Sequence, residues 1–166
     1  LRQQKISPEI TGGSQERDMR GGTENVYGIV GLTKALELSY ERLEEKHRHI
    51  SGLKDHMMKR LTTELEDIEF NGDPTGQSLY TVLSVSFPPK DVGSMLLFNL
   101  DIAGISASGG SACSSGAVGG SHVINHIKPG SDRTTIRFSF GPFNTMDDID
   151  KTVEELKKWY GKNNQA

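Results

Sequence analysis

The chain has one cysteine, Cys113, among its 166 residues. A lone thiol can form neither an internal disulfide nor a closed structural metal site, because both need further sulfur or imidazole ligands at defined spacing. A single free cysteine is typical of a reducing compartment, so we expect a cytoplasmic protein. The question that the cysteine raises is therefore its own reactivity.

The sequence also lacks a long hydrophobic run and an excess of positive charge. Its longest apolar stretch, near residues 95–100, is much shorter than a membrane-spanning helix, and its N-terminus lacks the apolar core of a signal peptide. The net charge is −3, and the lysines are scattered among acidic residues. We therefore expect neither a membrane nor nucleic acid as a partner.

With 34% hydrophobic and 25% charged residues, the composition is that of an ordinary globular chain. Its length allows one domain, or one domain and a piece of another. The first residue is Leu1 rather than methionine, and the opening residues read like the middle of a longer sequence, so we expect a fragment.

Helical periodicity dominates residues 24–65. Apolar residues recur there at steps of three, four and seven, which predicts one long amphipathic helix. An unbroken helix of that length would extend roughly 60 Å, so we expect a bend or a break near Ser51 and Gly52.

The second half of the chain alternates short strand and helix patterns. Strands are expected at 67–70, 80–87 and 134–140, with a brief one at 105–107. Helices are expected at 92–102, 122–127 and 145–160. His122 and His126 lie one turn apart but lack a third ligand, so we predict no metal site. The order of elements predicts an α+β fold: a small mixed, mostly antiparallel sheet with helices packed on one face, preceded by the long helix.

Cys113 lies within Gly-Gly-Ser-Ala-Cys-Ser-Ser-Gly-Ala-Val-Gly-Gly, residues 109–120. This segment is too polar and too rich in glycine for a protein core, where inert cysteines usually lie. Its five glycines indicate a loop that moves or approaches another group closely. The alternative is a solvated turn in which the cysteine is incidental.

Arg137 stands out in the strand at 134–140. Alternation places Ile136, Phe138 and Phe140 on one face of that strand, and Thr135, Arg137 and Ser139 on the other. A guanidinium held on a strand is suited to binding a carboxylate through two parallel hydrogen bonds. The alternative is a structural ion pair on the outer face of the sheet.

A second polar, glycine-rich segment, residues 12–23, ends where the long helix is expected to begin. Thr23 is a suitable N-cap for that helix. Free backbone N–H groups and nearby arginines make such a junction hospitable to phosphate. A capped helix start without any ligand is the alternative.

Taken together, these three segments resemble the C-terminal part of a cysteine desulfurase, in the aminotransferase class V branch of pyridoxal-phosphate enzymes. Residues 13–23 resemble the glycine-rich Glu-Arg loop of that family, residues 104–114 its thiol loop, and residues 136–141 its substrate-binding strand. The likeness covers nearly the whole chain in the same order. It is closest to the class with a long thiol loop, which serves nitrogenase and general iron–sulfur cluster assembly.

The resemblance implies specific roles. Cys113 would be the nucleophile that takes sulfur from L-cysteine as a persulfide and releases L-alanine. Arg137 would bind the substrate carboxylate, and Thr23 would donate to the phosphate of pyridoxal phosphate across the interface of a homodimer. The sulfur acceptor would be an iron–sulfur scaffold or another protein. No metal ligand is implied.

The resemblance also implies that the chain is the C-terminal portion of a fold-type I enzyme and that it has three parts. Residues 1–23 would be a phosphate-contacting loop of the large cofactor domain, residues 24–66 a connecting helix, and residues 67–166 the small α+β domain. The family's Ser-His-Lys segment, whose lysine forms the Schiff base, is absent from this sequence. The chain alone should therefore be inactive.

Two positions depart from the family pattern: Asp18 and Ser14 stand where glycine is common. Three alternatives to the desulfurase assignment stay open. They are a selenocysteine lyase, another class V enzyme, and a module without catalysis that dimerises or accepts sulfur.

Overall fold

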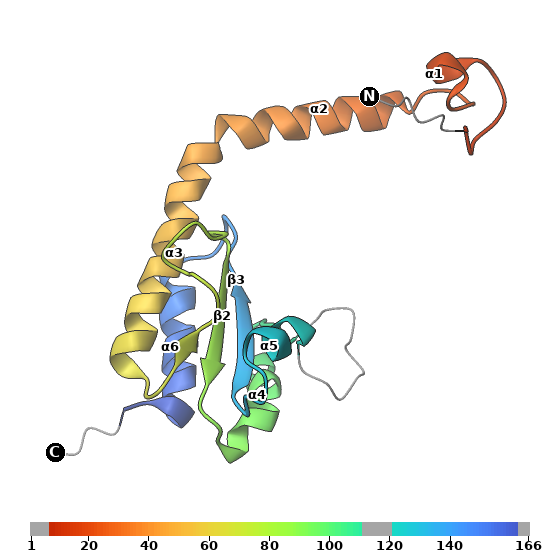
Figure 1. The fold of residues 1–166 in the computed structure, drawn as a ribbon. Coiled ribbons are helices and arrows are strands. Elements are labelled where there is room, and N and C mark those ends of the chain that lie inside the picture. The colour runs from red at the N-terminus through yellow and green to blue at the C-terminus, as the bar shows by residue number, and fades with distance from the viewer. Residues whose placement is uncertain (1–6, 111–120, 163–166) are drawn as a thin grey trace. The chain divides into compact units, whose positions relative to one another are not determined.

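A computed structural model describes residues 7–110 and 121–162. The chain divides into two compact units, Leu1–Leu43 and Glu44–Ala166 (Figure 1). The first unit contains α1 (Gln15–Asp18) and α2 (Val26–Glu41). The second contains the sheet and the remaining helices, beginning with α3 (Leu43–Glu64).

The helical pattern of residues 24–65 corresponds to two helices, α2 and α3, rather than one. Arg42 lies between them with non-helical dihedral angles, φ −111° and ψ 13°. Neither the bend nor the break expected near Ser51 and Gly52 is present, because α3 is continuous through both residues. The neighbours of Gly52, Ile50 and Leu53, are buried in the core, and their burial outweighs the cost of about 1 kcal/mol of a helical glycine.

The sheet has three antiparallel strands in the order β1 (Glu69–Phe70), β2 (Val82–Phe87) and β3 (Thr134–Ser139). Leu83 is opposite Phe138 and Val85 is opposite Ile136, and all four side chains are buried. The prediction of a brief strand at 105–107 is wrong. Only an isolated bridge forms there, between Ser108 and Arg137.

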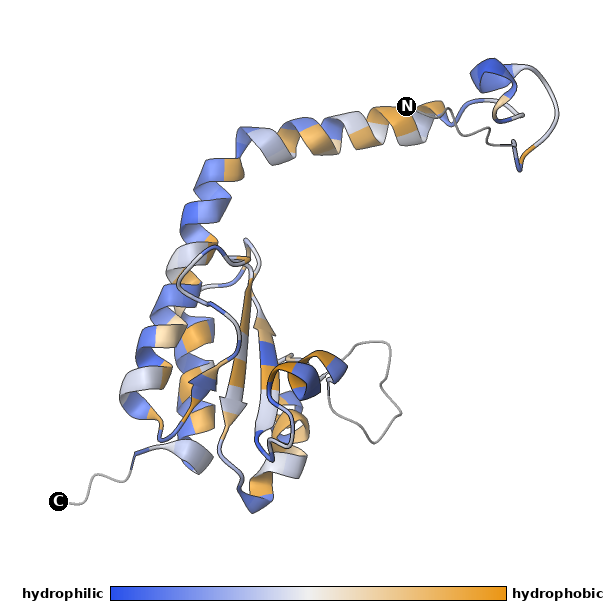
Figure 2. Cartoon of the chain, in the orientation of Figure 1, coloured by the Kyte–Doolittle hydropathy of each residue, from blue (hydrophilic) through white to orange (hydrophobic). Residues whose placement is uncertain are grey.

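Two helices cover the apolar face of the sheet. In Figure 1, α3 and α6 (Met146–Tyr160) lie side by side along that face. Figure 2 shows apolar residues concentrated where these elements meet. The fully buried residues they supply are Leu53, Met57, Leu61, Val153, Leu156 and Tyr160. Each such aliphatic side chain stabilises the fold by about 1.5–3 kcal/mol. The expected α+β fold is thus confirmed.

Three short helices complete the second unit: the 3₁₀ helix η1 (Asp91–Met95), α4 (Leu96–Ile102) and α5 (His122–Ile127). Gly104 follows α4 with φ +75°, the left-handed conformation that commonly ends a helix. At the start of α6, the Thr145 side chain accepts from the Asp148 N–H while Asp148 accepts from the Thr145 N–H. This capping box begins the helix that the sequence predicted at 145–160. None of the described helices has the length and apolar composition needed to cross a membrane.

Ion pairs join the outer surfaces of α3 and α6. Arg60 donates from Nε to Glu64 at 2.6 Å and from its two terminal nitrogens to Asp150 and Glu154 at 2.8 and 2.6 Å. Lys157 adds a 2.8 Å contact to Glu64. Arg60 first, and then Lys157, lower the pKa of Glu64 from its ordinary value of 4.5 to about 2.

This lowered pKa predicts a loss of stability in acid. Glu64 binds protons more weakly in the folded than in the unfolded chain, so its contribution is complete above pH 4.5 and is lost as the pH falls toward 2. Because the carboxylate is partly solvated, we expect Glu64→Gln to cost about 1 kcal/mol at pH 7. The difference from wild type should vanish near pH 2, as measured by urea unfolding.

Glu37→Gln is the control, because Glu37 makes one exposed ion pair, with Lys34, and such pairs contribute little. An equal cost of Glu64→Gln at both pH values would contradict the assignment of this stability to ion pairing.

Candidate active site

The Arg137 side chain projects from the polar face of β3 and is exposed. Its backbone is fixed on the outer side of the strand: the Arg137 N–H donates to the Ser108 carbonyl at 2.7 Å, and its carbonyl accepts from the Ser108 N–H at 3.1 Å. Within residues 7–110 and 121–162, no acidic side chain pairs with the guanidinium. The structural ion pair considered above is therefore not found among these residues.

An open cavity of about 320 Å³ lies beside Arg137. On the sheet side it is lined by Ser84, Thr135 and Arg137. The opposite wall is apolar and comes from α5, through Val123, Ile124 and Ile127. A cavity with the Arg137 cation and hydroxyl groups on one side and apolar side chains on the other can bind a small organic anion.

The same cavity is lined by Gly110 and Ser121, which flank residues 111–120, the stretch that contains Cys113. Cys113 itself lies outside the described residues. Both points at which that segment joins the described structure are nonetheless at the cavity that contains Arg137.

Hydrogen bonds order the polar face of the sheet next to Arg137. Asn71 Nδ2 donates to Ser84 Oγ at 3.1 Å and to Ser86 Oγ at 2.9 Å. Ser86 Oγ is in turn 2.9 Å from Thr135 Oγ1. Hydrogen bonds therefore connect Thr135, Ser86, Asn71 and Ser84 on the polar face, and Ser84 is the residue of β2 opposite Arg137.

Comparison with known proteins gives the family. The model of the family described as aminotransferase class V matches residues 3–152. The chain belongs to the aminotransferase class V family. The resemblance drawn from the three motifs is thereby confirmed.

The relatives within this family are named as cysteine desulfurases. The chain is 44% identical over 155 residues to "Putative cysteine desulfurase IscS 1" of Bacillus subtilis (strain 168), covering 92% of this chain and 40% of that protein. It is 35% identical over 156 residues to "Cysteine desulfurase IscS" of Dictyoglomus turgidum, covering 93% and 39%. The chain therefore spans about two fifths of the length of the curated relatives it matches.

Solved structures agree with this class V fold. A NifS-like protein from Rickettsia africae matches with a TM-score of 0.71 at 27% identity, over 93% of this chain and 40% of that one. A second NifS-like protein matches with a TM-score of 0.70 at 32% identity, over 92% and 38%.

Thr23 belongs to the first unit and is described only within it. It is not the N-cap of α2, as the sequence suggested: Asn25 is, because its side chain accepts from the Gly28 N–H at 3.0 Å. Two residues further from the helix, Thr23 is exposed, and its carbonyl accepts from Arg20 at 3.4 Å. Its hydroxyl has no hydrogen bond within the described part of the chain. The Thr23 hydroxyl is therefore available as a hydrogen-bond donor.

The loop before Thr23 has an unusual backbone. Glu16, Arg17 and Asp18 have φ values of 46°, 56° and 64°, in the left-handed region that side chains with a Cβ rarely adopt. The resemblance stated above expects glycine at Asp18, and glycine adopts this conformation without strain. The departure seen in the sequence therefore falls at a position whose backbone favours glycine.

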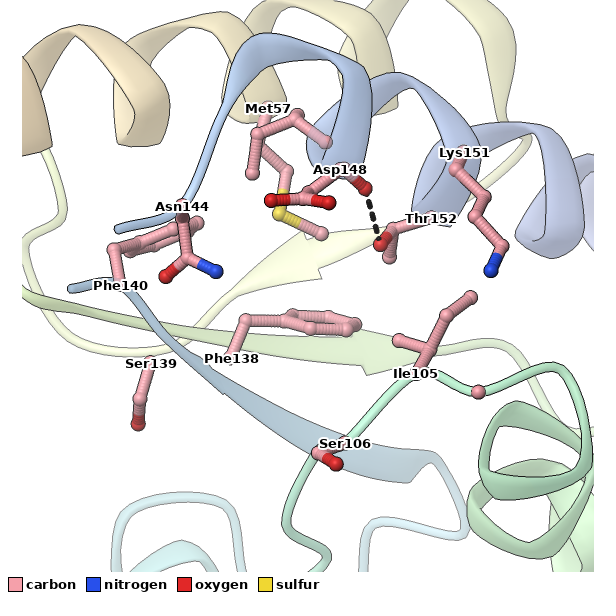
Figure 3. A pocket seen from close by; sticks show the side chains of 12 residues that line it. Met57, Ile105, Ser106, Phe138, Ser139, Phe140, Asn144, Asp148, Lys151 and Thr152 are labelled. Carbon is pink, nitrogen blue, oxygen red and sulfur yellow. Dashed lines mark hydrogen bonds between the residues drawn. The ribbon is translucent and has the colours of Figure 1, made fainter. Parts of the chain in front are cut away.

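A second hollow, of about 280 Å³, lies between α6 and the far end of β3. Figure 3 shows Ile105 and Phe138 within it, and Ser106, Ser139 and Lys151 around it. It contains neither Arg137 nor Thr23. In the described part of the chain no three His, Cys, Asp or Glu side chains form a group that could hold a metal ion.

Sequence reasoning did not single out Ser84 and Asn71. The alternation of Ser84 and Ser86 with buried residues along β2 was a signal that both face the polar side. Which strand lies next to which is not visible in that pattern, so their position beside Arg137 came only with the structure.

Proposed function

We propose that this chain is the C-terminal part of a pyridoxal-phosphate-dependent cysteine desulfurase, which takes sulfur from L-cysteine as a persulfide and releases L-alanine. Membership of the aminotransferase class V family and the names of its relatives support this proposal. The observation that carries it is the Arg137 guanidinium, which pairs with no acidic side chain among the described residues and lies in a cavity also lined by Gly110 and Ser121.

In this proposal Arg137 binds the substrate carboxylate. Its guanidinium makes two parallel hydrogen bonds to the two carboxylate oxygens, which fixes the orientation of the amino acid as well as its position. The backbone bonds to Ser108 hold the strand at that residue, so the orientation is set before the substrate arrives.

Cys113 is the nucleophile that takes the sulfur from the substrate, and its thiolate is the reactive form. The thiolate attacks the substrate sulfur, and a sulfur–sulfur bond forms as the carbon–sulfur bond of the substrate breaks. The electron pair of the broken bond passes to the carbon, which takes up a proton and gives the methyl group of L-alanine. Cys113 is left as a persulfide, and no external oxidant is consumed.

Pyridoxal phosphate, when bound, supplies an electron sink next to the substrate carbons. Thr23 would donate its hydroxyl to the cofactor phosphate, and we place that contact across a homodimer. No residue of α2 is buried within this chain, although the helix carries several apolar side chains. This exposed apolar surface supports an interface with further protein, as in a dimer. In this proposal the phosphate loop is residues 1–23, the connecting helix is residues 24–66, and the small domain is residues 67–166.

The sulfur would pass to an iron–sulfur scaffold or to another acceptor protein in the cytoplasm. A persulfide on a glycine-rich segment is suited to this transfer, because the sulfur must reach two places in turn. The chain alone lacks the family's cofactor-binding lysine and should be inactive.

The test joins residues 1–166 to the upstream part of the Bacillus subtilis relative, which is 44% identical to this chain. The joined protein should form L-alanine from L-cysteine and release sulfide in the presence of dithiothreitol, whereas the chain alone should form neither. A joined protein that folds and binds the cofactor but forms no alanine would overturn the proposal. A tenfold or greater preference for selenocysteine would instead assign a selenocysteine lyase.

A further inference from the structure

Ser84 is the residue of β2 directly opposite Arg137. Both backbone groups of Arg137 bond to Ser108, on the side away from β2. The Ser84–Arg137 pair is therefore a non-hydrogen-bonded pair of the antiparallel ladder, in which the two Cα atoms are only about 4.5 Å apart and the side chains lie close together. The next pair on this face, Ser86 and Thr135, shows that closeness, with 2.9 Å between its hydroxyl oxygens.

The hydroxyl of Ser84 is set up to donate. Its oxygen accepts from Asn71 Nδ2 at 3.1 Å. Both Nδ2 protons of Asn71 are used, one on Ser84 and one on Ser86, so the amide is held from two sides. An oxygen that accepts from Asn71 directs its own proton elsewhere, and Ser84 lines the cavity that Arg137 lines.

The cavity has the charge and surface of a site for a small monoanion. Arg137 is the one charged side chain among its described lining residues, so one negative charge neutralises it. The apolar α5 wall, with Val123 and Ile127, leaves room for a short carbon chain but offers no partner for a second charge. A carboxylate with a small organic body matches these features.

We propose that Ser84 is a second anchor for the substrate carboxylate, donating a hydrogen bond to it beside the Arg137 guanidinium, while Asn71 holds the Ser84 oxygen in place. This inference rests on the function proposed above. A carboxylate oxygen has two lone pairs, so it accepts from Ser84 and from Arg137 together. The third bond fixes the tilt of the carboxylate, which a single guanidinium leaves free.

The test titrates the 166-residue chain with propionate, followed by the amide NMR signals of β2 and β3. Propionamide, which has the same shape without the charge, is the matched ligand control. The matched variants are Ser84→Thr and Ser84→Val, which differ only in a hydroxyl against a methyl group. We expect Ser84→Thr to bind propionate within twofold of wild type and Ser84→Val to bind it roughly 5- to 10-fold more weakly.

Ser139→Ala is the control on the same face of β3, because Ser139 lines the other hollow. It should bind propionate as wild type does. Equal binding by Ser84→Thr and Ser84→Val would overturn the role of Ser84 and leave the Arg137 site standing, provided that Arg137→Gln abolishes binding. If wild type binds propionate no better than propionamide, or if Arg137→Gln binds it equally well, the carboxylate site fails, and the anchor fails with it.

Discussion

The Cys113→Ala variant of the joined protein is expected to lose alanine formation by a factor on the order of 10³ or more. Without the thiol there is no acceptor for the substrate sulfur, so the carbon–sulfur bond has no attacking partner to replace it. The KM for L-cysteine should change little, because Arg137 and the cavity beside it are untouched. A loss confined to kcat separates a missing nucleophile from a damaged binding site.

The same variant has a chemical readout. After one turnover without reductant, the peptide containing Cys113 should gain the mass of one sulfur atom, and Cys113→Ala should show no such gain. Cys113→Ser keeps the size and polarity of the side chain and should be as inactive as Cys113→Ala. Alanine formation at wild-type rates by either variant would remove Cys113 from the mechanism.

The elements predicted best are those whose pattern is strong and local. The alternation at 134–140 predicted β3 and the face that Arg137 occupies, and the helical pattern at 145–160 predicted α6. Strand alternation and helical periodicity are set by residues close together in sequence, so neither depends on the rest of the fold.

The predictions that were wrong depended on competition between neighbours or on distant packing. Thr23 and Asn25 are both good N-caps, and the sequence alone does not say which one the helix will use. Gly52 was expected to break a helix that buried neighbours keep intact, whereas the interruption falls at Arg42, which is an ordinary helix former.

The candidate site shows the same division. Arg137 could be chosen from its own strand, because guanidinium chemistry and alternation are properties of the sequence. Asn71 and Ser84 could not, since their relation to Arg137 depends on the register between β2 and β3 and on the turn that follows β1. Register is set by burial on the opposite face, where Leu83 and Val85 pack, and no local pattern reports it.

Arg137→Gln is expected to lower kcat/KM of the joined protein for L-cysteine by about 100-fold, or about 2.7 kcal/mol at 1.36 kcal/mol per tenfold. The loss follows from removing two charge-assisted hydrogen bonds to the substrate carboxylate. Arg137→Lys keeps the positive charge but replaces the planar guanidinium, with its two parallel N–H donors, by a single ammonium group. The loss of kcat/KM should therefore be smaller, near tenfold.

A substrate without a carboxylate isolates this contribution. Cysteamine is L-cysteine with the carboxylate replaced by hydrogen, so its turnover gains nothing from Arg137. The wild-type protein should prefer L-cysteine strongly, and Arg137→Gln should lose most of that preference while its rate with cysteamine stays within a few-fold of wild type. If Arg137→Gln lowered both rates equally, the variant would be damaging the fold or the cofactor site. Arg137 would then have no specific part in holding the carboxylate, because a group that binds one end of a substrate affects only substrates that have that end.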